Sequence, residues 1–115
     1  MPLVKKILSA FLALILLASA GFVLWAETPS GPMPEATAAL ESDASVQVTL
    51  KPWLIFESRS STPSSGLIFY PGGRVDPVSY APLARSLAEE GILAVIVPMP
   101  LNLAVFAPQK AEQVL

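Results

Sequence analysis

The segment Gly66-Leu-Ile-Phe-Tyr-Pro-Gly-Gly-Arg-Val-Asp76 decides the fold of this chain. Its first five residues form a continuous apolar run, which is typical of a strand covered on both faces in an α/β sheet. A double glycine follows, and a helix begins shortly after it. Consecutive glycines let the backbone approach a ligand closely and can direct successive N–H groups to one side. The turn is therefore a candidate site for an oxyanion or a phosphate.

The donors of such a site would be backbone amides. Pro71 has no N–H, so the candidates are the amides of Gly72, Gly73 and Arg74, aided by the positive end of the following helix. A tight turn that needs glycine for steric reasons alone is the alternative that the spacing leaves open. The Arg74 side chain is expected to be solvated, with contact to an acidic group as the alternative. Asp76 is expected to be a turn or cap residue.

A helix and a second buried strand follow the turn. Ser79 is predicted to be the N-cap, Gly91 is predicted to end the helix, and residues 92–97 form another continuous apolar strand. The positions predicted to face the core are Tyr80, Leu83, Ala84, Leu87 and Ala88, and those predicted to face outward are Arg85, Ser86, Glu89 and Glu90. Residues 110–115 resemble the start of a further helix.

The segment before Gly66 predicts a β-hairpin. Val46, Val48 and Leu50 alternate with polar residues, and a second apolar run covers residues 53–56. The later strand–helix–strand unit predicts a right-handed crossover with residues 66–70 and 92–97 paired in parallel. Ligands bind at the carboxyl ends of strands in such sheets, and the double glycine lies at that end.

The N-terminus is predicted to be a membrane anchor or a signal peptide, with a buried helix of a soluble protein as a third alternative. Lys5 and Lys6 precede the apolar run Ile7–Ala26, which as a helix would be about 30 Å long, enough to span a bilayer. The paired lysines favour a cytoplasmic N-terminus, so the remainder would lie outside the cytoplasmic membrane as a single-pass protein. Residues 18–20 read Ala-Ser-Ala, which favours the alternative of a secreted or periplasmic protein cleaved near Ala20.

Three regions follow from these patterns. Residues 1–26 are the anchor or signal, and residues 27–45 carry three prolines and acidic residues without a basic one, which predicts a disordered linker. Residues 46–115 are the folded domain. About 70 residues make a marginal core, and the chain has no cysteine to cross-link it.

Composition excludes several function classes. The net charge is −2 and the seven basic residues are scattered, which excludes a nucleic-acid partner. Neither phosphate-loop motif is present, and nothing in the pattern implies a cofactor or a metal. The chain contains no histidine and no cysteine, so Ser79 and Ser86 lack a base that could activate them as nucleophiles.

Several runs of the sequence resemble a bacterial branch of the α/β-hydrolase superfamily. They are Leu67-Ile-Phe-Tyr-Pro-Gly-Gly-Arg-Val-Asp76, Tyr80-Ala-Pro-Leu-Ala84, Leu87-Ala-Glu-Glu-Gly91 and Met99-Pro-Leu-Asn-Leu-Ala-Val105. The resemblance covers about residues 46–115 and implies the N-terminal half of a hydrolase sheet: a hairpin, a strand, an oxyanion turn, a helix, a parallel strand and a helix start. Many relatives carry His-Gly where this chain has Tyr70-Pro71.

The resemblance implies that the backbone of residues 72–74 supplies an oxyanion-hole amide. It also implies that the nucleophile, on a Gly-x-Ser-x-Gly turn, and the acid and histidine come later than residue 115. We therefore expect a serine hydrolase of carboxylic-ester type that is inactive as this segment alone. A small ester-like substrate is expected only together with the missing half, and the strand at 92–97 is expected to lie at an open sheet edge. The alternatives are a small membrane-tethered binding module and a non-functional remnant.

Overall fold

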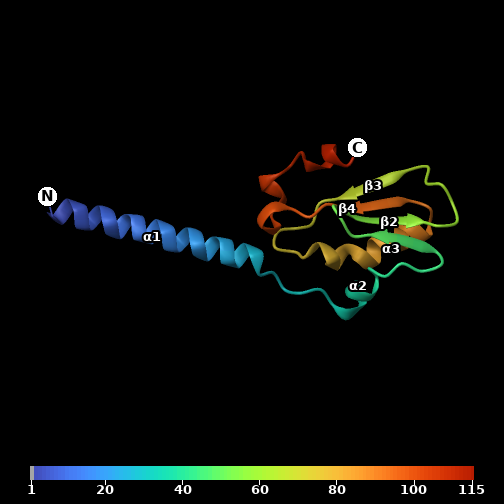
Figure 1. Ribbon diagram of the computed structural model, residues 1–115, viewed down its shortest axis with the longest axis horizontal. Coiled ribbons are helices and arrows are strands. Elements are labelled where there is room, and N and C mark those ends of the chain that lie inside the picture. The colour runs from blue at the N-terminus through green and yellow to red at the C-terminus, as the bar shows by residue number, and fades with distance from the viewer. Residues whose placement is uncertain (1) are drawn as a thin grey trace.

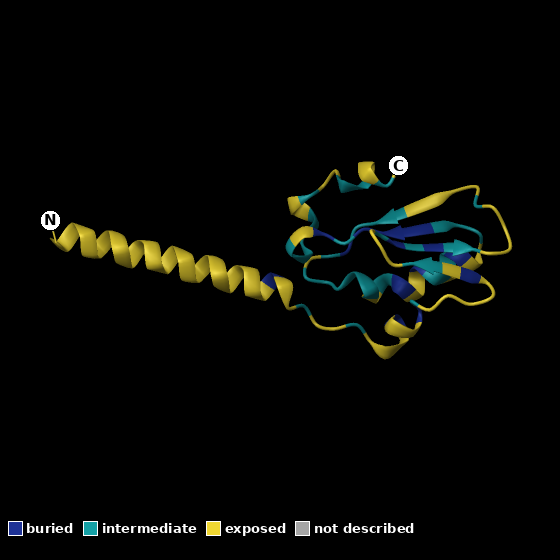
Figure 2. Cartoon of the chain, viewed as in Figure 1, coloured by how far each residue is buried: buried dark blue, intermediate teal, exposed yellow. Residues whose placement is uncertain are grey.

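The computed structural model describes residues 2–115 and consists of one long helix joined to a small α/β domain (Figure 1). The long helix α1 spans Pro2–Glu27 and projects away from the domain. Nearly all of its residues are exposed (Figure 2), Ala26 being the exception. Its mean hydropathy of 2.6 and its length suffice to cross a membrane, a property that signal sequences share.

The domain is built on a four-stranded mixed sheet. The strands are β1 (Val46–Thr49), β2 (Leu54–Ser58), β3 (Gly66–Phe69) and β4 (Leu93–Ile96), in the spatial order β1-β2-β4-β3. β1 pairs antiparallel with β2, and β2 antiparallel with β4. β3 pairs in parallel with β4, with Gly66 opposite Leu93 and Phe69 opposite Ile96. The predicted hairpin and the predicted parallel pair are both confirmed.

The position of β4 corrects one expectation. β4 lies between β2 and β3, so the strand at residues 92–97 has a partner on each side and is not an edge. The edges are β1 and β3, and Leu67 of β3 remains 45% exposed. Buried apolar runs indicate covered faces, which both internal and edge strands can have, and this is why the sequence pattern could not identify the edge.

Both faces of the sheet are covered. On one face, Phe56 and Ile96 pack against three alanines of α3 (Ala81–Glu89), which are Ala81, Ala84 and Ala88. On the other face, Val95 and Val97 pack beneath the chain that follows β4. This C-terminal chain forms three short 3₁₀ turns, at Pro100–Asn102, Ala104–Phe106 and Lys110–Gln113. The predicted helix start at 110–115 is therefore a single 3₁₀ turn.

The helix α3 begins later than predicted, and its predicted core face is confirmed at Tyr80, Ala84, Leu87 and Ala88 but not at Leu83. The N-cap position of α3 is Tyr80, not Ser79, and no side chain caps it. Asp76 instead caps the 3₁₀ turn Pro77–Tyr80 that leads into α3, since its Oδ1 accepts from the Val78 N–H at 2.9 Å. The small residue Ala81 is fully buried, whereas Leu83 is 52% exposed. A stripe of alanines lets the helix approach the sheet closely, which leaves the larger leucine outside. Gly91 ends the helix region with φ 87°, as expected.

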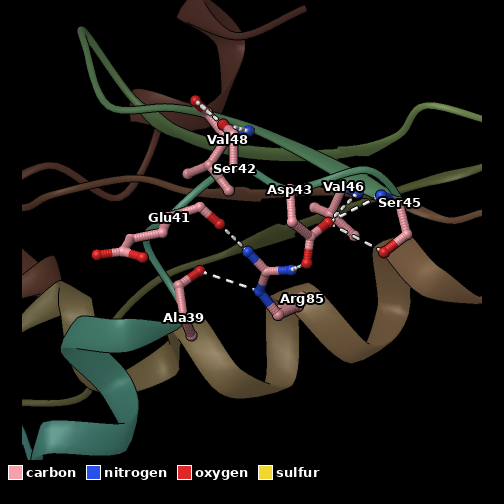
Figure 3. Close-up of polar contacts among 8 residues, drawn as sticks. All are labelled: Ala39, Glu41, Ser42, Asp43, Ser45, Val46, Val48 and Arg85. Carbon is pink, nitrogen blue, oxygen red and sulfur yellow. Dashed lines mark hydrogen bonds and ion pairs between the residues drawn. The ribbon is translucent and has the colours of Figure 1, made fainter.

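Part of the segment predicted to be a disordered linker is packed on the domain. It contains the short helix α2 (Pro34–Ala38), and Ala36 and Ala39 are buried. Arg85, predicted to face solvent, reaches across from α3 and donates to the carbonyls of Ala39 and Glu41 (Figure 3). The hydrogen bonds of Arg85 thus attach this segment to the domain, although the composition of the segment alone predicts disorder.

Asp43 completes this attachment. Its Oδ2 lies 2.8 Å from Arg85 Nη1, and its Oδ1 accepts from the backbone N–H groups of Val46 and Ser45 (Figure 3). The hydrogen bond from Val46, followed by those from Ser45, lowers the pKa of the Asp43 carboxyl from 3.8 to about 2. The ionised carboxylate therefore anchors the start of β1.

Acidification should weaken the attachment that Asp43 makes at the start of β1. Because the folded-state pKa lies below the unfolded-state value, the contribution of Asp43 to stability is complete above about pH 4 and is lost as the pH falls towards 2. The Asp43→Asn variant retains an amide oxygen but not the charge, so its stability should depend less on pH in this range. Denaturation midpoints at pH 6 and pH 3 for both proteins check this, and equal losses for the two would contradict it.

Candidate functional site

The double-glycine turn lies at the carboxyl ends of the two parallel strands. β3 ends at Phe69 and β4 at Ile96, and the arrowheads of both strands point towards the side from which α1 approaches (Figure 1). The chain leaving each strand contributes to this rim, and the two meet where Arg74 N–H donates to the Asn102 carbonyl at 2.8 Å. The predicted site is thus at the ligand-binding end of the sheet.

The three candidate amides are not equivalent. The Gly72 N–H donates to the Tyr80 hydroxyl at 2.9 Å, and the Arg74 N–H is bonded to Asn102. Gly73 is exposed, and its N–H donates to no other atom within residues 2–115. Since a bonded amide must first give up its partner, Gly73 carries the one open donor among the three.

The two glycines also differ in how much space surrounds them for a side chain. A Cβ on Gly72 would lie 3.3 Å from the Tyr80 hydroxyl and 3.4 Å from Val75, which is tighter than ordinary packing. A Cβ on Gly73 would meet only Leu103 Cδ2 at 3.6 Å, an ordinary contact. A side chain at Gly72 would therefore press on its neighbours, whereas a Cβ at Gly73 would fit with ordinary packing.

Tyr80 is a site residue that sequence reasoning assigned only to the core. Its ring packs near Phe69, with centroids 6.3 Å apart, as the helical pattern indicated. Its hydroxyl oxygen, however, accepts the Gly72 amide, so its own proton remains available for a further acceptor at the turn. The sequence did contain a signal for this role, because a tyrosine on the core face of a helix carries a hydroxyl that needs a hydrogen-bond partner.

The Arg74 side chain neither extends into solvent nor meets an acidic group. Its Nε donates to the carbonyl of Trp25 at 2.9 Å, its Nη2 donates to that of Thr28 at 3.0 Å, and its guanidinium lies 4.4 Å from the Trp25 ring centroid. The Asn102 side chain donates to the Ala26 carbonyl at 2.8 Å. A cation at a helix C-terminus is favourable because the last carbonyls lack intrahelical partners. The side chains of Arg74 and Asn102 therefore cap the C-terminal end of α1.

Three non-glycine residues with left-handed backbone lie around this rim. Arg74, Leu101 and Asn102 have φ of 55°, 53° and 53°. This region is uncommon for residues with a Cβ, especially for leucine, and such conformations are found often at binding and catalytic sites. Here they let the two loops bond to each other and to the end of α1.

The remaining polar groups near the turn do not make a catalytic set. Ser79 is exposed, and the Ser86 hydroxyl donates to the Pro82 carbonyl within α3. The Tyr70 hydroxyl is used to hold the C-terminal segment of the chain. It donates to the Pro108 carbonyl and accepts from the Ala111 N–H. No cluster of three possible metal ligands occurs among residues 2–115.

The three largest pockets described on residues 2–115 are not lined by Gly72, Gly73 or Arg74. One open groove of about 480 Å³ lies between α2 and α3 beside Arg85, a second of about 480 Å³ lies beside Lys110, and one of about 370 Å³ lies between Met33 and Ser79. The turn is thus an open rim that offers a donor.

The sequence of this part of the chain identifies its family. Residues 66–115, which begin at β3 and include the turn, α3 and β4, match the model of the alpha/beta hydrolase family. The match covers less than half of the chain, and it supports the α/β-hydrolase superfamily for this segment. The segment is an N-terminal portion of the fold, and the mixed sheet with its helices is consistent with a partial α/β-hydrolase domain. No curated protein and no solved structure gives a significant match.

Proposed function

We propose that this chain is the N-terminal part of a membrane-anchored serine hydrolase of carboxylic-ester type, in which the Gly73 amide is an oxyanion-hole donor. The observation that carries the proposal is the open N–H of Gly73 at the carboxyl rim of a hydrolase-family sheet. In α/β-hydrolases one oxyanion amide comes from the loop after the third strand, which is the position of Gly73.

The chemistry assigns the turn one role. When a serine attacks an ester carbonyl, negative charge develops on the carbonyl oxygen, and a preoriented N–H stabilises that charge. The bonds of Gly72 to Tyr80 and of Arg74 to Asn102 hold the turn in place, so that the Gly73 donor needs little reorganisation. The chain contains no histidine to activate a serine, so the proposal assigns the nucleophile and the base to sequence beyond Leu115.

The anchor completes the proposal. α1 is long and apolar enough to span a bilayer, and Lys5 and Lys6 at its start favour a cytoplasmic N-terminus. The domain would then act outside the cytoplasmic membrane. Intact mass of the membrane-extracted protein separates an anchor that begins at Met1 from a product cleaved after Ala20.

An anion titration tests the donor on this chain. We expect methylphosphonate, which resembles the tetrahedral oxyanion, to shift the backbone amide resonance of Gly73 in ¹⁵N-labelled protein in micelles. The Gly72 and Arg74 resonances should move less, because their N–H groups already have acceptors. Equal shifts for all three amides, or none at any concentration up to tens of millimolar, would contradict the assignment.

The hydrolase assignment itself has a separate test. Translation of the reading frame beyond codon 115 should give a Gly-x-Ser-x-Gly-type turn followed by an acid and a histidine. A continuation without that turn would refute the catalytic part of the proposal.

A further inference from the structure

We infer that the last turns of α1 and the loop at residues 101–106 form one membrane-contacting surface, so that the candidate site faces the bilayer and meets amphiphilic esters. The inference rests on the proposed function, since it assumes that α1 spans the membrane and that Gly73 binds a reacting ester. We call this surface the interfacial patch. It is made by Phe22, Trp25, Val105 and Phe106.

The patch unites two segments that are far apart in the sequence. Phe22 lies 6.0 Å from Trp25 and 6.4 Å from Phe106, between ring centroids. All four side chains remain exposed, with Val105 at 77% and Phe106 at 54%. Exposed apolar side chains that gather in one place mark a surface that contacts something apolar.

Polar contacts hold the patch together. Arg74 and Asn102 bond to the carbonyls at the end of α1, and Ala26 is completely buried there. The orientation of α1 on the domain is thus set by direct contacts in addition to the chain connection. The same two residues make the hydrogen bond that joins the turn to the loop at 101–106.

The occupant follows from continuity with α1. α1 is exposed along almost its whole length (Figure 2), and its exposed large apolar side chains extend from Leu3 to Phe22 and Trp25. A span of about 20 residues from Ile7 places these two aromatic residues at the outer boundary of the hydrocarbon. Tryptophan and other aromatic residues are favoured at that depth. Phe106 lies against Phe22, so the loop must reach the same boundary.

The site shares this loop. Leu103 belongs to the same loop as Val105 and Phe106, and its Cδ2 is the atom nearest to a Cβ built on Gly73, at 3.6 Å. The carboxyl rim faces the side from which α1 approaches, whereas the loop between β2 and β3 lies at the opposite end of the sheet (Figure 1). An ester that partitions into the outer leaflet would therefore reach Gly73 without crossing the domain.

Single-cysteine labelling tests the inference on the full chain in phosphatidylcholine vesicles. The chain has no native cysteine, so each variant carries one fluorophore. We expect acyl-chain doxyl lipids to quench a label at Phe106→Cys at least twofold more than one at the exposed loop residue Thr62→Cys. A label at Gly73→Cys, where a Cβ fits, should be quenched by headgroup-borne nitroxide more than the label at Thr62→Cys.

A label at Leu14→Cys in the middle of α1 separates the possible failures. If the Leu14 label is not quenched by doxyl lipids, the membrane anchor of the proposed function is wrong and the inference falls with it. If the Leu14 label is quenched but the Phe106 label is quenched no more than the Thr62 label, the patch does not touch the bilayer and the inference is wrong. A Phe106 label shielded from both lipid and water indicates a protein partner and also overturns the inference. An unquenched Gly73 label shows that the site faces away from the membrane, which overturns it as well.

Discussion

The Phe56→Ala variant is expected to lose about 3–5 kcal/mol of the free energy of unfolding. Phe56 is fully buried on β2 and is the largest of the fully buried side chains, packed between the sheet and α3. Its removal leaves a cavity that the surrounding strands cannot close, because they are fixed by ladder bonds to β1 and β4. A domain of this size has little stability to spare, so the variant should be largely unfolded. Urea denaturation in micelles, followed by Trp53 fluorescence, measures the change.

The matched control is Leu83→Ala. This residue lies in the first turns of α3 and is 52% exposed, so its loss should change the free energy of unfolding by less than about 1 kcal/mol. The helical pattern alone placed Leu83 in the core, and in that case the two variants would be similarly destabilised. Equal losses would contradict the packing described here.

In the hydrolase that we propose, the Gly73→Pro variant is expected to lower kcat by about 10²–10³-fold, with a smaller effect on KM. Proline removes the N–H that the proposed mechanism directs at the developing oxyanion, and the donor acts only after the nucleophile has attacked. Steady-state hydrolysis of a p-nitrophenyl ester by the membrane-extracted enzyme measures the change.

Gly73→Ala is the comparison that separates the N–H from the backbone. It keeps the donor, its Cβ meets Leu103 at an ordinary 3.6 Å, and its backbone is not in the left-handed region, so it should lose much less activity than the proline variant. A similar loss in both would assign the effect to distortion of the turn. Full activity in the proline variant would remove Gly73 from the mechanism.

Much of the domain could be predicted because its signals are local. The alternation at residues 46–50 and the apolar runs at 66–70 and 92–97 depend on the faces that a strand presents, and the structure confirms three of these strands as β1, β3 and β4. Gly91 ends the helix region because a positive φ is cheap only for glycine. Parallel pairing followed from the intervening helix, and it placed the turn at the correct end of the sheet.

The candidate site was located to the turn but not to one amide. The sequence alone cannot distinguish three neighbouring N–H groups, because they differ only in their hydrogen-bond acceptors. Gly72 donates to the Tyr80 hydroxyl, and Arg74 donates to the Asn102 carbonyl in another loop. Arg85 shows the same limit, since its partners lie more than 40 residues earlier. Such pairings form only once the sheet and α3 are packed.

By itself, then, the sequence determined the four strands, the parallel pair, the rim that carries the turn and the apolar helix at the start, because each depends on the periodicity or backbone preference of a short segment. Only the tertiary structure decided that β4 is internal, that Leu83 is outside, that Gly73 is the one residue of 72–74 with an open amide, and that Arg74 and Asn102 cap α1. These features depend on which distant groups meet in space, and a buried or capped polar group is satisfied by whichever partner the packing brings within reach.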